Sequence, residues 1–132
     1  MRKKEIPKIK RRFDRLVSQI ILTRADRTCD MCGRKEGRMN ASHCVPRQVL
    51  SVRWNLKNLT CLCYRCHLWV WHKDPITAYE WFKTKYGLDR INYLKKESNK
   101  PFNLDENQVK VIEVELRTQW NLLNIFNQIE SE

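Results

Sequence analysis

The sequence predicts an α+β fold in which a small core, held together by cysteine ligands, lies between helical segments. Two Cys-x-x-Cys pairs, 30 residues apart, enclose a stretch without helical periodicity that contains two of the three glycines. On both sides of this stretch, apolar residues recur at spacings of three and four, as in amphipathic helices. We therefore expect one domain with a basic N-terminal helix (residues 1–27), a core (28–87) and a C-terminal helical extension (88–132).

The charge of the chain is large and unevenly distributed. The net charge is +11, and residues 105–132 carry −4, which leaves +15 on residues 1–104. Such an excess favours a polyanionic partner, most simply nucleic acid, over charge that serves only solubility. The apolar run at residues 20–22 is far too short for a membrane span or a signal peptide, so we expect a soluble, cytosolic protein.

The N-terminal helix is expected over residues 8–26. Phe13, Val17 and Ile20 belong to an apolar stripe, and basic residues occupy the positions between the apolar ones. The stripe needs a partner surface, whereas the basic face is free to meet phosphate groups. The candidate DNA contacts on this helix are Lys10, Arg11 and Arg12.

The middle of the chain predicts a short strand followed by helices. Residues 54–63 end in an alternating pattern that is typical of a strand. Residues 66–73 are expected to begin a short helix that stops at Asp74 and Pro75. The same two residues suit the start of the next helix, with Asp74 as N-cap and Pro75 at the first helical position, and Gly87 suits its end.

Two more helices are expected in the C-terminal extension. The first covers residues 88–98 and is predicted to be capped by Asp89. The second is a long helix of roughly 25 residues, longer than is usual in globular proteins, and Asn103 and Glu106 have the spacing of a capping box before it. Its apolar stripe is expected to pack partly on the N-terminal helix and partly on a second copy or another protein.

The two cysteine pairs have the spacing of zinc knuckles. Two intervening residues let both thiolates of a pair turn onto one metal, and two such pairs complete a tetrahedral, closed site of the structural kind. Buried thiols with this spacing by chance are the weaker alternative, and a redox pair leaves the second pair unexplained. The predicted zinc ligands are Cys29, Cys32, Cys63 and Cys66. Cys44 and Cys61 are interpreted as small buried hydrophobic residues.

The aromatic residues of the middle segment are interpreted as core rather than as groups that stack on bases. This interpretation rests on their helical spacing, and it covers Trp69, Trp71, Trp81 and Phe82. Trp54 lies outside a clear helical pattern and is expected to pack against the zinc-binding frame.

Three polar residues stand in a fixed order around the knuckles: His43 in "SHCVPR", Asn58 in "NLTCLC" and His67 in "CYRCH". With the cysteine pairs, this order resembles the HNH nucleases, the zinc-stapled branch of the ββα-metal fold, over residues 28–73. A narrower likeness extends from "LTRADRTCDMCGR" through "NASHCVPR" to "LTCLCYRCH". In these runs the chain is similar to the phage NinG (Rap) recombination proteins, which share a basic helical lead-in.

The resemblance implies a metal-dependent DNA endonuclease that leaves 3′-hydroxyl and 5′-phosphate ends. It places His43, as general base, on the second strand of a hairpin, and His67, as ligand of a catalytic Mg²⁺ or Mn²⁺, at the start of a helix. It further implies that Asn58 pins the loop of His43 and that Arg47 is placed to clamp a phosphate. A histidine that titrates near neutrality and a divalent cation suit phosphodiester hydrolysis. A phage origin implies the cytoplasm of a bacterial host, and the subgroup implies branched recombination intermediates as substrates.

One position departs from the pattern. Many HNH enzymes carry Asp or His before the base as a second metal ligand, whereas this chain has Ser42, whose hydroxyl is a poor ligand. His72 is the candidate replacement. In a regular α-helix, however, His67 and His72 diverge by about 140° around the axis and do not face one metal unless the chain bends.

Two other functions compete with this interpretation. The first is a non-catalytic zinc module that binds nucleic acid, which the serine at position 42 favours. The second keeps the nuclease but gives it a nicking role in phage DNA packaging. A homodimer through the long C-terminal helix is expected if the enzyme resolves branched DNA, because that task needs two active sites.

Overall fold

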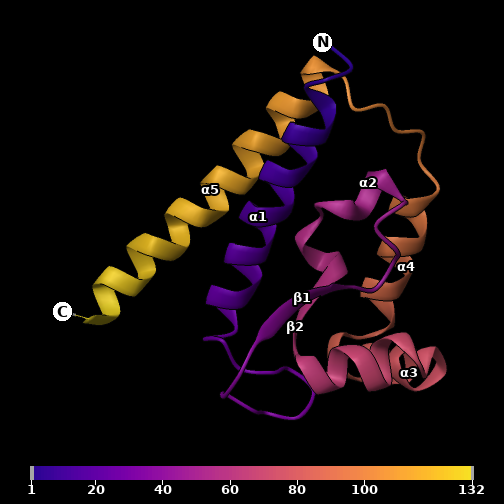
Figure 1. The fold of residues 1–132 in the computed structure, drawn as a ribbon, viewed down its shortest axis with the longest axis vertical. Helices are drawn as coiled ribbons and strands as arrows, with labels where there is room; N and C mark the ends of the chain where they lie inside the picture. The colour runs from indigo at the N-terminus through magenta and orange to yellow at the C-terminus, as the bar shows by residue number, and fades with distance from the viewer. Residues whose placement is uncertain (1, 132) are drawn as a thin grey trace.

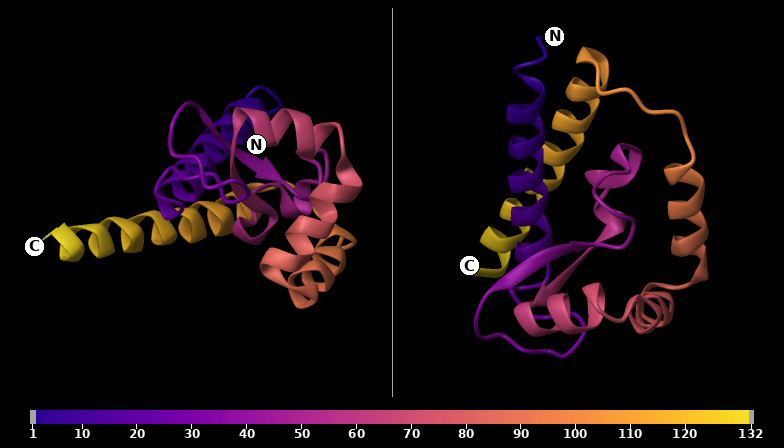
Figure 2. Two further views of the ribbon diagram at one scale, coloured as in Figure 1. Left: turned by 90° about the horizontal axis from the view of Figure 1, so that it is seen from below. Right: turned by 45° about the vertical axis from the view of Figure 1, so that its right-hand side comes forward.

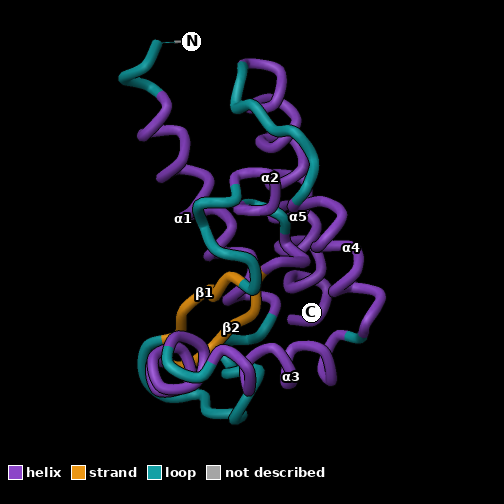
Figure 3. The backbone as a smooth tube through the Cα atoms, turned by 90° about the vertical axis from the view of Figure 1, so that its right-hand side faces the viewer, coloured by secondary structure: helices purple, strands orange, loops and turns teal. Residues whose placement is uncertain are grey.

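A computed structural model describes residues 2–131 and has an α+β fold, rich in helices and with one small sheet. The strands β1 and β2 pair in antiparallel fashion near the centre of the molecule (Figures 1 and 3). Helices surround them on both sides in the two further views (Figure 2). The elements in chain order are α1 (Ile6–Arg24), β1 (Met39–His43), α2 (Leu50–Arg53), η1 (Leu56–Asn58), β2 (Leu59–Cys63), η2 (Cys66–His72), α3 (Pro75–Tyr86), α4 (Leu88–Ser98) and α5 (Glu106–Ser131).

The first and last helices lie side by side along one flank of the molecule (Figure 1). Phe13, Val17 and Ile20 of α1 are buried in the main core, as their spacing predicts. Leu116 of α5 is buried in the same core. Beyond this contact, α5 runs out from the body (Figure 2), and Phe126 near its end is 65% exposed. The predicted packing of α5 on the N-terminal helix is therefore present, since Val109, Ile112 and Trp120 also pack against the core, and the apolar stripe becomes exposed only toward the end of the helix.

The sheet is short and deeply enclosed. His43 pairs with Leu59 and Met39 with Cys63 in the antiparallel register. All five residues of β2 are buried, because α1 contacts the sheet and η2 packs against β2. His43 is the last residue of β1, the first of the two strands. The placement of this histidine on a second strand was therefore wrong, since the residues from Cys29 to Arg38 form turns and loops instead of a strand.

The helix ends agree with the prediction at both ends of α3 and differ at the starts of α4 and α5. The Asp74 side chain accepts a hydrogen bond from the Thr77 amide, 3.3 Å away, and caps α3 as expected. Gly87, with a φ of 93°, separates α3 from α4. Because α4 begins directly after this glycine, Asp89 lies in its first turn and does not cap it.

The start of α5 also differs from the prediction. The side chain of Asp105 accepts a hydrogen bond from the Gln108 amide at 2.9 Å, so Asp105 caps this helix. The predicted capping box of Asn103 and Glu106 was wrong, because the helix begins only at Glu106.

A second, smaller core lies under α2, α3 and α4, around Val52, Phe82, Ile91 and Leu94. Phe82 is fully buried there, and Trp71 and Trp81 are partly buried against it, as predicted. Trp69 is 59% exposed, with the Lys73 ammonium 3.8 Å from its ring centre, so its prediction as a core residue was wrong.

Trp54 packs on helix α1. Its ring meets the ring of Phe13 edge to face, with 5.5 Å between the ring centres.

Among the helices of residues 2–131, none has both the length and the hydropathy that a bilayer crossing requires.

Candidate functional site

Four cysteines converge on one point. The sulfur atoms of Cys29, Cys32, Cys63 and Cys66 all lie within 4.8 Å of one another, and none is in a disulfide. Two come from the turn after α1, and two flank the junction of β2 with η2. Four thiols at this spacing match a tetrahedral zinc site without an open position, as the doubled Cys-x-x-Cys pattern predicts.

Local backbone geometry turns each cysteine pair inward. The Cys29 amide donates to the Arg34 carbonyl, and Gly33 takes a φ of 78°, which a side chain rarely adopts. In the second knuckle, the Cys66 amide donates to the Cys63 sulfur at 3.5 Å. Burial opposes ionisation of Cys63, but this amide and the neighbouring thiols outweigh it and lower the pKa of Cys63 to about 7. Burial and the same contacts among the thiols raise the pKa values of Cys32 and Cys66, so of these three Cys63 most readily supplies thiolate, the form that binds metal.

The two remaining cysteines lie outside the cluster. Cys61 is fully buried and Cys44 is partly buried. Burial is the main cause that raises the pKa of each thiol to about 11. Both therefore stay neutral and pack as small apolar side chains, in agreement with their interpretation from the sequence.

His67 and His72 face each other on the short π-helix η2. The segment η2 is a π-helix, in which residues five apart are linked by the backbone hydrogen bonds and lie close in angle. Their Nε2 atoms are 3.0 Å apart, and the rings meet at 85°. The divergence of the two side chains was calculated for an α-helix. It does not apply here, because the segment is a π-helix.

Ser42 reaches His67 from the sheet. Its side-chain oxygen lies 2.6 Å from Nδ1 of His67, and the serine is only 1% exposed. Ser42 is therefore on the far side of the His67 ring from His72. The position that lacks the expected carboxylate thus still contacts the histidine pair.

His43 is held by hydrogen bonds at two points. Its Nε2 lies 2.9 Å from the Arg53 carbonyl oxygen, and its own carbonyl accepts from the Trp71 indole N–H at 2.7 Å. A carbonyl only accepts, so Nε2 carries a proton, and in the neutral ring the lone pair is on Nδ1. Within residues 2–131, Nδ1 has no hydrogen-bond partner.

The environment of His43 keeps it neutral. Burial is the main cause that lowers its pKa, and the positive charge of Arg47 acts in the same direction. The hydrogen bond to Arg53 opposes these effects without overcoming them. His43 therefore offers an unprotonated Nδ1 at neutral pH, as a general base requires.

Asn58 fixes the segment that follows His43. It is fully buried, its Oδ1 accepts from the Val45 amide, and its Nδ2 donates to the carbonyls of Val45 and Val52. Its own carbonyl accepts from the Cys44 amide. All its polar groups thus serve the loop, and none is left to touch a substrate.

Asp14 of α1 organises the basic residues near His43. Its carboxylate accepts from Arg47 at 2.8 Å, from Arg53 at 2.7 and 3.0 Å, and from the Trp54 indole at 2.8 Å. Burial opposes ionisation of Asp14, but these donors outweigh it and lower its pKa. Sequence reasoning missed this residue, although it is the only acidic residue in α1, which was the available signal.

The basic residues predicted to contact DNA differ in exposure and in ion pairing. Arg47 keeps 59% of its side chain exposed while it is paired with Asp14. Arg12 forms an ion pair with Glu113 of α5, so part of its charge is neutralised. Arg11 is exposed, Lys10 is partly exposed, and neither has an ion pair within residues 2–131.

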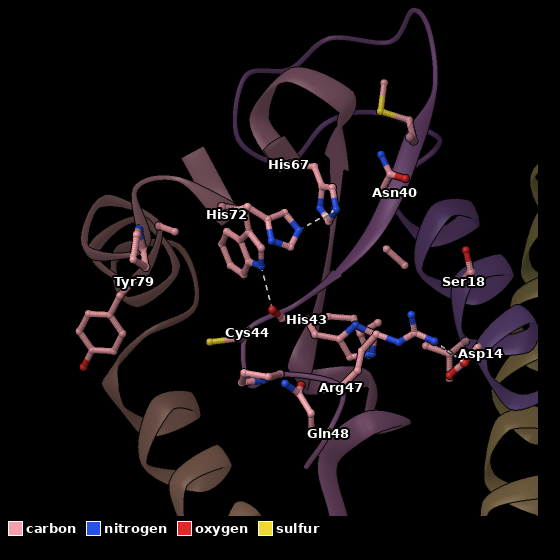
Figure 4. Close-up of a pocket in the computed structure, with 18 of the residues that line it drawn as sticks. Asp14, Ser18, Asn40, His43, Cys44, Arg47, Gln48, His67, His72 and Tyr79 are labelled. Atoms are coloured by element: carbon pink, nitrogen blue, oxygen red, sulfur yellow. Dashed lines mark hydrogen bonds and ion pairs between the residues drawn. The ribbon is translucent and has the colours of Figure 1, made fainter. Parts of the chain in front are cut away.

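A hollow of about 820 Å³ brings these side chains together (Figure 4). His43, His67, His72 and Arg47 line it, so three histidines from two separate segments share one space. Sequence reasoning did not identify several further lining residues: Asp14, Ser18, Asn40, Gln48 and Tyr79. Asn40 has a buried side-chain N–H₂ group that finds no hydrogen-bond partner among residues 2–131.

Comparisons of the chain with known protein families, with curated proteins and with solved structures found no match. The chemistry of the site is therefore judged from its own residues.

Proposed function

We propose that the protein is a metal-dependent DNA endonuclease of the HNH type. The observation that carries the proposal is the arrangement in the hollow: a neutral His43, with no hydrogen-bond partner at Nδ1 among residues 2–131, lines the same hollow as the His67–His72 pair. A base, a pair of metal donors and a cation for phosphate are the groups that phosphodiester hydrolysis needs. The exposed guanidinium of Arg47 is the group available to the phosphate.

The proposed role of His43 follows from its hydrogen bonds. The Arg53 carbonyl fixes the protonated Nε2, so the ring accepts the proton of a water molecule at Nδ1. Trp71 holds the carbonyl of His43 and Asn58 holds the next residues of the chain, and both limit movement of the ring. These contacts preorganise the base, which is the condition for efficient proton transfer.

The histidine pair suits a divalent metal. Two Nε2 atoms 3.0 Å apart fit two ligands of one cation with bonds of about 2.1 Å, as imidazole forms with zinc. Such a cation polarises the phosphate and stabilises the charge that develops on its oxygens. Imidazole donors favour transition metals over Mg²⁺, so we expect Ni²⁺ to bind most tightly and Mg²⁺ most weakly in a series that includes Mn²⁺.

DNA is the proposed substrate because of the charge on the first 104 residues. Asp14, Val17 and Ser18 of α1 line the hollow, so DNA that enters it passes along this helix. Arg11 and Lys10 lie on the same helix without ion pairs in the described chain. Selectivity for branched DNA and a dimer through the exposed part of α5 are further elements of the proposal, and they rest on the resemblance.

Cleavage assays of His43 variants test the proposal. His43→Ala and His43→Gln are compared with the wild type on duplex, flap, D-loop and four-way-junction DNA with Mn²⁺. The Gln amide can still donate to the Arg53 carbonyl but cannot act as a base. We expect both variants to lose cleavage by roughly 10²- to 10⁴-fold, with zinc content and DNA affinity unchanged.

The glutamine variant separates catalysis from structure. A purely structural His43 in a non-catalytic binding module predicts that His43→Gln behaves like the wild type in every assay. Wild-type cleavage by both variants would refute the nuclease assignment, and absence of cleavage by the wild type on all four substrates with every metal would do the same.

A further inference from the structure

Ser42 contacts the histidine pair on the Nδ1 side of the His67 ring. Its Oγ is 2.6 Å from Nδ1 of His67, whereas Nε2 of the same ring faces His72. The two ring nitrogens point in different directions, so a cation held at Nε2 is out of reach of Oγ. Ser42 therefore acts on the site through His67 and does not replace the missing carboxylate.

The chemistry of imidazole defines what this contact does. A neutral histidine carries one proton, and the nitrogen that binds metal must be the one without it. If His67 and His72 direct their Nε2 lone pairs to one cation, each ring must carry its proton on Nδ1. For His67, this proton points at the oxygen of Ser42.

We infer that Ser42 is a positioning residue that holds the ring orientation of His67 and accepts its Nδ1–H when a metal is bound at Nε2. The inference rests on the metal centre of the proposed function. Partners of this kind are common behind metal-bound histidines, where they fix the tautomer and raise the basicity of the ligand. Here the partner is a hydroxyl that is 1% exposed, so water does not compete for the bond.

Burial makes the loss of this single hydrogen bond costly. Within residues 2–131, Ser42 Oγ and His67 Nδ1 have no other hydrogen-bond partner. A hydroxyl can also donate to an unprotonated Nδ1, so the contact anchors the ring in either tautomer. Without the hydroxyl, the Nδ1–H that metal binding at Nε2 requires is left without its acceptor, and the lost hydrogen bond weakens metal binding.

The experiment measures binding of Ni²⁺, as probe cation, to protein whose four-cysteine cluster already holds zinc. Calorimetry compares the wild type with Ser42→Ala, for which we expect affinity to fall by roughly 10- to 100-fold. Ser42→Thr keeps the hydroxyl and is expected to stay close to the wild type. His67→Ala and His72→Ala show how far Ni²⁺ affinity falls when one histidine of the pair is removed.

Thr60 offers a matched control on the opposite strand. It is directly across from Ser42 in the register and is equally buried at 1% exposure. Its hydroxyl bonds to Asp30 and Tyr86 and to neither histidine. Thr60→Val therefore removes a buried hydroxyl from the same sheet, and we expect it to lower stability while Ni²⁺ affinity stays within about twofold of the wild type.

Nuclear magnetic resonance of the wild type gives a readout that does not depend on a variant that folds. With Zn²⁺ as a diamagnetic probe at the histidine pair, the ¹⁵N shifts of His67 are expected to show metal at Nε2 and a slowly exchanging proton at Nδ1. In Ser42→Ala, this proton is expected to exchange rapidly.

The outcomes separate this inference from the proposed function. Equal Ni²⁺ affinity of Ser42→Ala and wild type, an equal loss in Ser42→Ala and Thr60→Val, or metal at Nδ1 of His67 would each overturn the role of Ser42. Failure of the His67 and His72 variants to weaken Ni²⁺ binding would overturn the metal centre itself. Metal binding that depends on Ser42 in a protein that cleaves no DNA would support the inference and reject the nuclease.

Discussion

The cysteine cluster and the histidine hollow are neighbours in the chain and differ in how they are built. Cys66 belongs to the first and His67, the next residue, to the second. The cluster draws on two short turns, each closed by its own backbone hydrogen bonds. The hollow draws on α1, β1, the loop after it and the π-helical turn.

This difference is the one expected between a structural site and the proposed functional site. The cluster is closed: its four sulfur atoms lie within 4.8 Å of one another and suffice for a tetrahedral metal, and three of the four cysteines are buried. The hollow is open to solvent and contains polar groups without partners among residues 2–131, such as Nδ1 of His43 and Nδ2 of Asn40. A site that must admit a substrate needs such unpaired groups, and a site that only holds the fold does not.

The largest effect is expected from loss of a cysteine ligand. Cys29→Ser leaves an incomplete zinc site, and structural zinc contributes on the order of 10 kcal/mol to folding in small domains, comparable with the whole stability of a domain. We expect the variant to be unfolded by circular dichroism and to lack zinc. Cys44→Ser, outside the cluster, is the control and should remain folded with one zinc ion.

Loss of the Asn58 side chain is expected to disturb the hollow and leave the cluster intact. Asn58→Ala leaves the Val45 amide and carbonyl without their partners and removes one donor from the Val52 carbonyl, which keeps the Asn55 amide. We expect the free energy of unfolding in urea to fall by about 3 kcal/mol. Asn40→Ala removes an amide without a hydrogen-bond partner at its N–H₂ group, so its stability should change by less than about 1 kcal/mol. Equal losses in both variants would argue against the pinning role.

A smaller effect is expected for the indole of Trp71. Trp71→Phe keeps an aromatic ring in the second core but removes the donor to the His43 carbonyl. We expect a loss of about 1 kcal/mol in stability and a decrease of several-fold in cleavage, because the base is held less firmly. Unchanged cleavage with reduced stability would confine Trp71 to the core.

The smallest effect on stability is expected from the titration of His43. Burial, with help from Arg47, lowers its pKa from 6.5. Below pH 6.5 the unfolded chain therefore binds more protons at this residue than the folded protein does, and stability falls as pH decreases through this window to the folded pKa. The acid limb of the cleavage profile should also lie below pH 6.5 and should vanish in His43→Gln. An acid limb above pH 6.5 would mean that another group controls the reaction.

The sequence by itself determined the features that depend on local spacing. The cysteine pairs act within single turns, so their spacing was sufficient to predict the cluster. Asp74, Pro75 and Gly87 act on the nearest helix end, and the periodic apolar residues of α1 reach the core as predicted. The choice of His43, Asn58 and His67 came from a resemblance, and the structure places His43 and His67 at one hollow.

Only the tertiary structure decided the features that depend on contacts between distant segments. Asp14 meets Arg47 and Arg53 because α1 packs against the sheet and the loop after it, which no local pattern encodes. The π-helical turn that aligns His67 with His72 differs from an α-helix by one residue per hydrogen bond, and periodicity over seven residues cannot distinguish the two. Ser42 reaches His67 across 25 positions because strand pairing places β1 beside the end of β2. The residue types that carry the chemistry could be read from the sequence, whereas their partners are set by packing.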